Sequence, residues 1–216
     1  MDPLHLAIAL GPLSVYLVLL GAIHLAPRPF VTSGSRDAAA LGVGIGGLVV
    51  AGPLELFVPE SFVFIWGALV WVLLLLLYGL CLTLHVLVMR PRIVIYNVSR
   101  EVVRPLLANL VTDLDREARW AGDCLALPRL GVQLHIEASP AMRVVQLVAA
   151  GPQQSYEGWR RLQMTLMPAL RQTPGTRHHL GYVLVGCGIA MVALMSLLLV
   201  LDPQTVQESL VEMLRW

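Results

Sequence analysis

The sequence predicts an integral membrane α-helical protein with about four transmembrane helices and a small α+β cytoplasmic domain inserted between the third and fourth spans. Composition is the first observation: 57% of the 216 residues are hydrophobic and 13% are charged. Soluble domains average about 45–50% apolar and about 25% charged residues. The second observation is a set of long apolar stretches, and the third is one more polar segment with strand-like and helix-like patterns between them.

The apolar stretches are long enough to cross a bilayer, which takes about 20 helical residues. The second stretch is the weakest, because it is rich in glycine and contains Pro53 and Glu55 near its end. A shorter or broken helix inside the bundle is the alternative there, since glycine lets neighbouring helices approach closely. The four predicted spans cover residues 4–25, 38–58, 62–89 and 180–201.

Arginine placement predicts the orientation, because cytoplasmic loops carry an excess of basic residues. Residues 90–179 hold twelve of the fifteen basic residues, all of them arginine. We therefore expect residues 90–179 to be cytoplasmic and both termini to be non-cytoplasmic. The residues predicted to lie at the membrane interface are Arg28, Arg36, Arg90, Arg92, Arg177 and Trp216.

The predicted domain organisation follows from these spans. It comprises a three-span transmembrane region (1–90), a cytoplasmic α+β domain (91–178), a fourth transmembrane helix (179–201) and an amphipathic non-cytoplasmic tail (202–216).

Within the α+β domain, apolar periodicity predicts strands and helices in a defined order. Residues 130–138 alternate, with Val132, Leu134 and Ile136 on one side, as expected for a half-buried strand. Residues 92–98 and 143–150 are β-branched runs. Helical spacing follows Ser99 and again begins at Tyr156, and 124–127 is a further short strand. The order favours a small antiparallel sheet with helices on one face.

No catalytic residues and no metal site are predicted from motifs. The chain lacks the Walker lysine motif, G-x-S-x-G, H-E-x-x-H and C-x-x-C. The net charge of +1 argues against a nucleic-acid partner, which normally requires a concentrated basic excess. An enzyme is therefore not the favoured reading, and the expected partners are the lipid bilayer and another protein or a second copy of the chain.

Four histidines are the candidate cofactor-binding residues. His24 ends the first span, His85 lies near the inner end of the third, and His178 and His179 open the fourth. Neutral imidazoles on neighbouring helices bind haem iron or metal ions. The simpler interpretation is that polar residues are tolerated at the membrane surface, so the expectation is no cofactor, with haem or a metal ion as the alternative.

Three functions are compatible with this pattern. The favoured one is a non-enzymatic anchor or interaction protein that presents its α+β domain to the cytoplasm. The second is a haem- or metal-binding membrane protein that uses the four histidines. The third is a small transporter or channel subunit, although few charged residues lie within the spans to mark an ion path.

Overall fold

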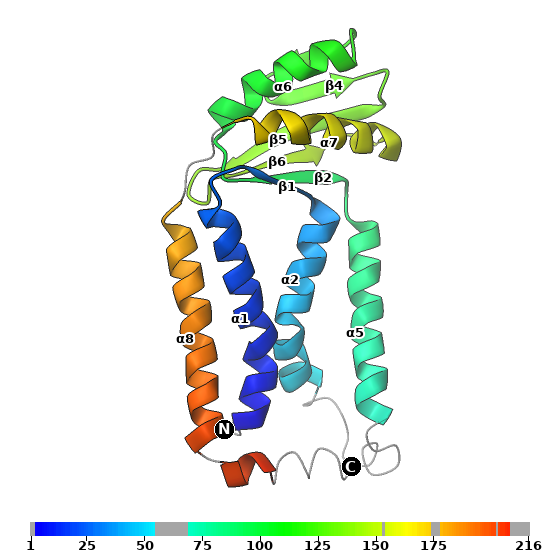
Figure 1. Cartoon of the computed structure of the whole chain (residues 1–216). Helices are drawn as coiled ribbons and strands as arrows, with labels where there is room; N and C mark the ends of the chain where they lie inside the picture. Colours follow the sequence, from blue (N-terminus) through cyan, green and yellow to red (C-terminus); the bar gives the residue numbers. More distant parts are fainter. Residues whose placement is uncertain (1–2, 55–68, 153, 174–177, 202, 208–216) are drawn as a thin grey trace. The chain divides into compact units, whose positions relative to one another are not determined.

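The structure is a computed structural model that describes residues 3–54, 69–152, 154–173, 178–201 and 203–207 (Figure 1). Its described residues form two compact units. The helical unit falls within residues 1–21, 38–88 and 183–216, and the sheet unit within residues 22–37 and 89–182.

Three helices are long and apolar enough to cross a membrane: α1 (Pro3–Leu25), α5 (Leu69–Val88) and α8 (Leu180–Leu201). In their most apolar windows only 11%, 6% and 11% of the residues, respectively, are buried. A helix that is apolar all round is normally surrounded by protein core or by lipid. Here apolar side chains face outward, which suits a lipid environment.

The prediction of about four spans is corrected, because the described residues contain three such helices. The second predicted span becomes α2 (Gly34–Val49), followed by a π-helical turn η1 (Val50–Leu54). The 16 residues of α2 rise only about 24 Å at 1.5 Å per residue, short of a ~30 Å hydrocarbon core. Residues 55–68, which hold the end of this span and the start of the third, lie outside the described part.

Glycines let the helices of this unit approach closely. A Cβ on Gly47 of α2 would collide with the carbonyl oxygen of Ile8 in α1. The Tyr78 hydroxyl of α5 donates to the Gly42 carbonyl of α2 at 2.6 Å. Small residues at helix contacts allow this close approach, so the glycine-rich sequence of α2 serves packing.

The sheet unit contains a six-stranded antiparallel sheet with the order β1-β2-β6-β5-β4-β3. Two helices, α6 (Arg100–Leu114) and α7 (Tyr156–Arg171), pack on it and contact each other (Figure 1). The strands are β1 (Phe30–Ser33), β2 (Arg92–Tyr96), β3 (Arg119–Ala121), β4 (Cys124–Leu127), β5 (Val132–Ser139) and β6 (Val144–Ala149).

The core lies between the sheet and the two helices, as the alternation of apolar residues predicts. Val132, Leu134 and Ile136 of β5 are buried, while His135 and Glu137 lie on the other face. Each fully buried leucine contributes about 2 kcal/mol through the hydrophobic effect. The helices supply Val103, Leu107 and Val111 from α6 and Trp159, Leu162, Leu166 and Leu170 from α7.

The strand β1 comes from the connection between α1 and α2, far from the rest of the sheet in sequence. It pairs antiparallel with β2, so that Phe30 lies opposite Tyr96 and Ser33 opposite Ile93. The sequence did not predict this strand. The α+β domain is thus completed by a loop that joins two apolar helices.

Candidate functional site

A group of polar side chains in the sheet unit gathers near the end of β2. We call it the polar junction and define it by His24, Asp37, Tyr96, Asn97 and His178. All five residues belong to the sheet unit, although they come from the end of α1, the first turn of α2, the end of β2 and the residues before α8.

Asn97 links the end of β2 to the end of α1. The residue is only 1% exposed, and Nδ2 donates to the carbonyl oxygens of Ile23 at 2.5 Å and Ala26 at 3.2 Å. The last carbonyls of an α-helix have no partner within the helix, so Asn97 caps α1. Its φ of 61° lies in the left-handed region, where asparagine is one of the few common residues besides glycine.

Tyr96 connects the same strand to α2. Its phenolic hydroxyl donates to Oδ1 of Asp37 at 2.5 Å. Asp37 lies in the first turn of α2, where the helix dipole favours a carboxylate. The ring of His24 meets the ring of Tyr96 edge-on, with centroids 5.5 Å apart.

Three of the four predicted histidines lie together. The ring centroids of His24 and His178 are 6.5 Å apart, and those of His178 and His179 are 4.3 Å apart. The backbone N–H of His178 donates to the His24 carbonyl at 3.2 Å. His24 is buried, and its Nδ1, like Oδ1 of Asn97, has no hydrogen-bond partner of normal geometry in the described part of the chain.

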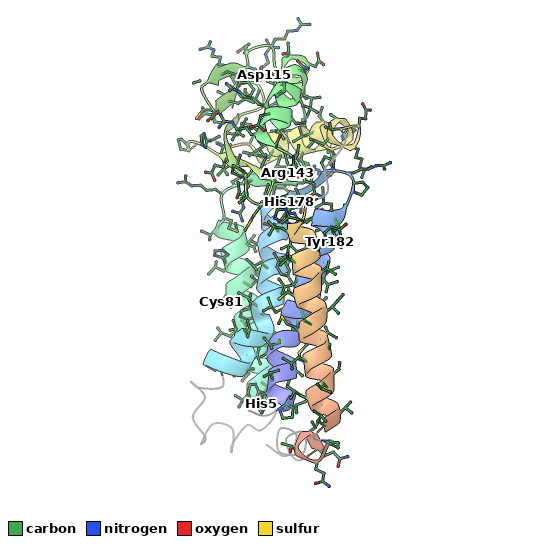
Figure 2. All side chains as sticks on the ribbon, turned by 90° about the vertical axis from the view of Figure 1, so that its left-hand side faces the viewer. His5, Cys81, Asp115, Arg143, His178 and Tyr182 are labelled. Atoms are coloured by element: carbon green, nitrogen blue, oxygen red, sulfur yellow. The ribbon has the colours of Figure 1, made fainter. Side chains whose placement is uncertain are left out.

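His178 acts as a cap for α8. Its Nδ1 accepts from the backbone N–H of Leu180 at 3.3 Å, which requires the unprotonated nitrogen of a neutral ring. Desolvation lowers the pKa of His178 below its usual 6.5, and the nearby charges of His179 and Arg143 lower it further. Figure 2 shows Arg143 and His178 near each other. Geometry and electrostatics thus both favour neutral His178.

The fourth predicted ligand, His85, lies on α5 in the helical unit, where its side chain is exposed. Among the described residues, no group of three or more His, Cys, Asp or Glu side chains has the arrangement of a metal site. In the described structure, His178 of this group hydrogen-bonds to helix ends. Haem or metal binding by the histidines stays a prediction.

The predicted interface residues have varied surroundings. Arg28, Arg36 and Arg90 are exposed, whereas Arg92 is half-buried and its side chain lies against Gly34. Nε of Arg92 is buried and has no hydrogen-bond partner within the described ranges. Arg177 and Trp216 lie outside the described residues, as do most residues of the predicted amphipathic tail.

Sequence reasoning missed the residues that organise the junction. Residues 92–98 were predicted as one strand, which hid the left-handed turn at Asn97. The available signal was the change from a β-branched run to Tyr96-Asn97 just before the Ser99 helix cap. Local sequence could not identify the partner of Asp37, because that partner, Tyr96, is 59 positions away.

Comparison of the chain with protein-family models, with curated proteins and with solved structures finds no match.

Proposed function

We propose that this chain is a non-enzymatic integral membrane protein that presents its α+β domain to the cytoplasm, where the domain binds a partner protein. The observation that carries the proposal is the strand β1. Because the loop between α1 and α2 pairs with β2, the sheet has its full set of strands only when it is attached to these helices. This dependence supports a domain that works while attached to its membrane helices.

The polar junction supports the same proposal. Hydrogen bonds from Tyr96, Asn97 and His178 reach the ends of α1 and α2. These hydrogen bonds fix the ends of the two helices to the sheet. In the described part of this junction, the three groups bond to helix-end carbonyls or to a carboxylate in the first turn of a helix, as caps do.

The positions of the arginines support a cytoplasmic location for the sheet unit. Arg28 and Arg36 flank β1, and Arg90 and Arg92 follow α5. Arginines close to the ends of spans determine orientation more reliably than charges deep inside a long domain. This positive-inside pattern favours a cytoplasmic sheet unit.

Cysteine labelling tests the orientation. The three cysteines Cys81, Cys124 and Cys187 are first replaced by serine, and Ser139→Cys and Gln204→Cys are introduced separately. An impermeant maleimide added to intact cells is expected to label Gln204→Cys and to reach Ser139→Cys only after permeabilisation. Labelling of Ser139→Cys in intact cells would contradict the proposed orientation.

Crosslinking tests the partner. All fifteen basic residues are arginine, so an introduced lysine is the only side-chain amine. With Ser139→Lys or Met164→Lys in native membranes, an amine-reactive crosslinker is expected to give a defined adduct with one other protein. Gln204→Lys is the matched control and gives none. Absence of any adduct from both domain positions counts against the proposal.

A haem- or metal-binding function is the second candidate, and the observation in its favour is the grouping of His24, His178 and His179. An absorption spectrum and elemental analysis of protein from cells supplied with haem and metals test it. A Soret band or stoichiometric metal that disappears in His178→Ala supports it. A colourless, metal-free protein removes it.

A further inference from the structure

We propose that Cys124 is a site of reversible modification, where a low-molecular-weight disulfide such as oxidised glutathione forms a mixed disulfide with the thiol and His135 acts as the base. The inference goes beyond the proposed function, because the covalent change needs neither a partner protein nor a particular membrane orientation. We call Cys124 and His135 the thiol–imidazole pair.

The first argument is the position of the pair in the sheet. Cys124 begins β4 and is the register partner of His135 in β5. The backbone N–H of Ile136 donates to the Asp123 carbonyl at 3.0 Å. Hydrogen-bonded and non-hydrogen-bonded pairs alternate along an antiparallel ladder, so Cys124 and His135 form a non-hydrogen-bonded pair. Facing side chains lie closest together in such pairs.

The second argument is the contact between the two side chains. Sγ of Cys124 lies 3.5 Å from Nδ1 of His135, as a hydrogen bond. Nδ1 accepts the thiol proton when the neutral ring carries its own proton on Nε2. The thiolate, and not the thiol, is the nucleophile. A base within hydrogen-bond reach is the arrangement that activates such a group.

The third argument is access to the thiol. Cys124 is exposed, and the pair lies on the sheet face opposite the core that α6 and α7 cover. The carboxylate of Asp123, the residue before Cys124, forms an ion pair with Arg100 of α6. This ion pair and the bond from Ile136 hold the end of the β3–β4 turn. The thiol is therefore presented to solvent from a fixed position beside its base.

The position of the other cysteines favours a mixed disulfide over an internal one. The chain has three cysteines, and Cys81 on α5 and Cys187 on α8 belong to the helical unit. Cys124 is thus the one cysteine in the sequence of the sheet unit. Its oxidation to a disulfide within this unit requires a thiol from outside the unit, which a small disulfide supplies.

The charged neighbours of the pair are of both signs. Glu137 lies two residues along β5 on the same face. Arg119 of β3 is opposite Ala126, which follows Cys124 on this face of β4. Among the described side chains, only His135 has a hydrogen bond to Sγ of Cys124. The base that is within reach of the thiol proton is therefore His135.

The exchange is balanced in atoms and electrons. Nδ1 of His135 takes the proton from Sγ, and the thiolate of Cys124 attacks one sulfur of the small disulfide. The new bond to Sγ forms as the disulfide bond of the reagent breaks, and the released thiolate takes the proton from the imidazolium. The sulfur of Cys124 is oxidised and the released sulfur is reduced. Excess free thiol reverses the exchange by the same route.

The test uses the full chain in nanodiscs with Cys81→Ser and Cys187→Ser, so that Cys124 is the single thiol. Oxidised glutathione is added at about pH 7, and mass spectrometry follows the mixed disulfide. We expect His135→Asn to slow its formation about tenfold, below the roughly hundredfold contribution of a base in a closed active site, because this thiol is exposed. The matched control is Ser139→Cys with Cys124→Ser, an exposed position at the end of β5, whose reaction His135→Asn leaves unchanged.

A change of pH separates a base from a change in access. A free thiol has a pKa of about 8.5, so at about pH 9.5 solvent ionises the thiol without a base, and the rates with and without His135→Asn are expected to converge. Equal rates at pH 7 would overturn the proposal, as would equal slowing at both pH values. Slowing of the Ser139→Cys control to the same extent would also overturn it.

Discussion

Nδ2 of Asn97 lies 2.5 Å from the carbonyl oxygen of Ile23, so a residue at the end of a sheet strand caps the end of an apolar helix 74 positions earlier. Asn97 also has a left-handed backbone, with a φ of 61°. One side chain therefore satisfies two requirements, a cap and a turn, and each requirement can be tested separately.

Replacing Asn97 tests the cap. Asn97→Ala removes both hydrogen bonds and leaves a residue that disfavours left-handed φ, so we expect a loss of about 1–3 kcal/mol in unfolding free energy. Asn97→Gly removes the same hydrogen bonds but tolerates the backbone, and its loss is expected to be smaller. Thermal unfolding in mild detergent measures both, and a Tm of Asn97→Ala equal to that of the unmodified protein contradicts the cap.

Removing the hydrogen bond between Tyr96 and Asp37 tests the link between β2 and α2. Tyr96→Phe keeps the ring beside His24 and removes the hydroxyl that donates to Asp37 at 2.5 Å. Hydrogen bonds to charged groups contribute about 1.5–3 kcal/mol, so we expect destabilisation of that order. In a double-mutant cycle with Asp37→Asn, the two changes are expected to be non-additive. Additive effects would show that the two side chains act independently.

The pKa of His178 predicts a pH dependence. Because burial and nearby positive charge lower this pKa below 6.5, the unfolded chain takes up the proton first as the pH falls. The stability that neutral His178 contributes is therefore fully present above pH 6.5. It is lost as the pH falls from 6.5 through the lower pKa of His178 in the folded state. We expect His178→Gln to flatten the pH dependence of Tm on the acidic side.

The control for this titration is His135→Gln, which removes a histidine of the same domain from the sheet face. It is expected to retain the acidic loss of stability. An identical pH profile for the unmodified protein and His178→Gln would contradict the role of His178.

Glycine substitutions test the packing of the helical unit. A Cβ on Gly47 would collide with the backbone carbonyls of Ile8 and Ala9, whereas a Cβ on Gly79 would meet no atom within 4 Å. Overpacking of this kind typically costs about 1–3 kcal/mol. We expect Gly47→Ala to lower Tm and Gly79→Ala to leave it unchanged or raise it slightly. Equal Tm values for the two variants would contradict the close approach of α1 and α2.

Local patterns predicted much of the sheet unit. The alternation of Val132, Leu134 and Ile136 and the helical spacing from Tyr156 both correspond to elements in the structure. These signals are strong because one face of each element is buried against a core. The antiparallel sheet with helices follows from them.

Features that depend on tertiary contacts were not visible in the sequence. The four residues of β1 are too few to establish an alternating pattern, and only pairing with β2 makes them a strand. Asn97 and Asp37 depend on partners more than 50 positions away. The break in the second predicted span was also not visible: its α-helix becomes a π-turn at Val50, and its last residues lie outside the described part of the chain.

The loop between two apolar helices completes the sheet of the α+β domain. Thr32 and Val94 are register partners in β1 and β2, and Val94 is in turn opposite Gln146 in β6. In a cysteine-free background in native membranes, Thr32→Cys with Val94→Cys is expected to form a disulfide under mild oxidation, detected by mass spectrometry. Thr32→Cys with Gln146→Cys, two strands apart, is expected to remain reduced. No disulfide in the first pair, or equal yields in both, would contradict the pairing of β1 with β2.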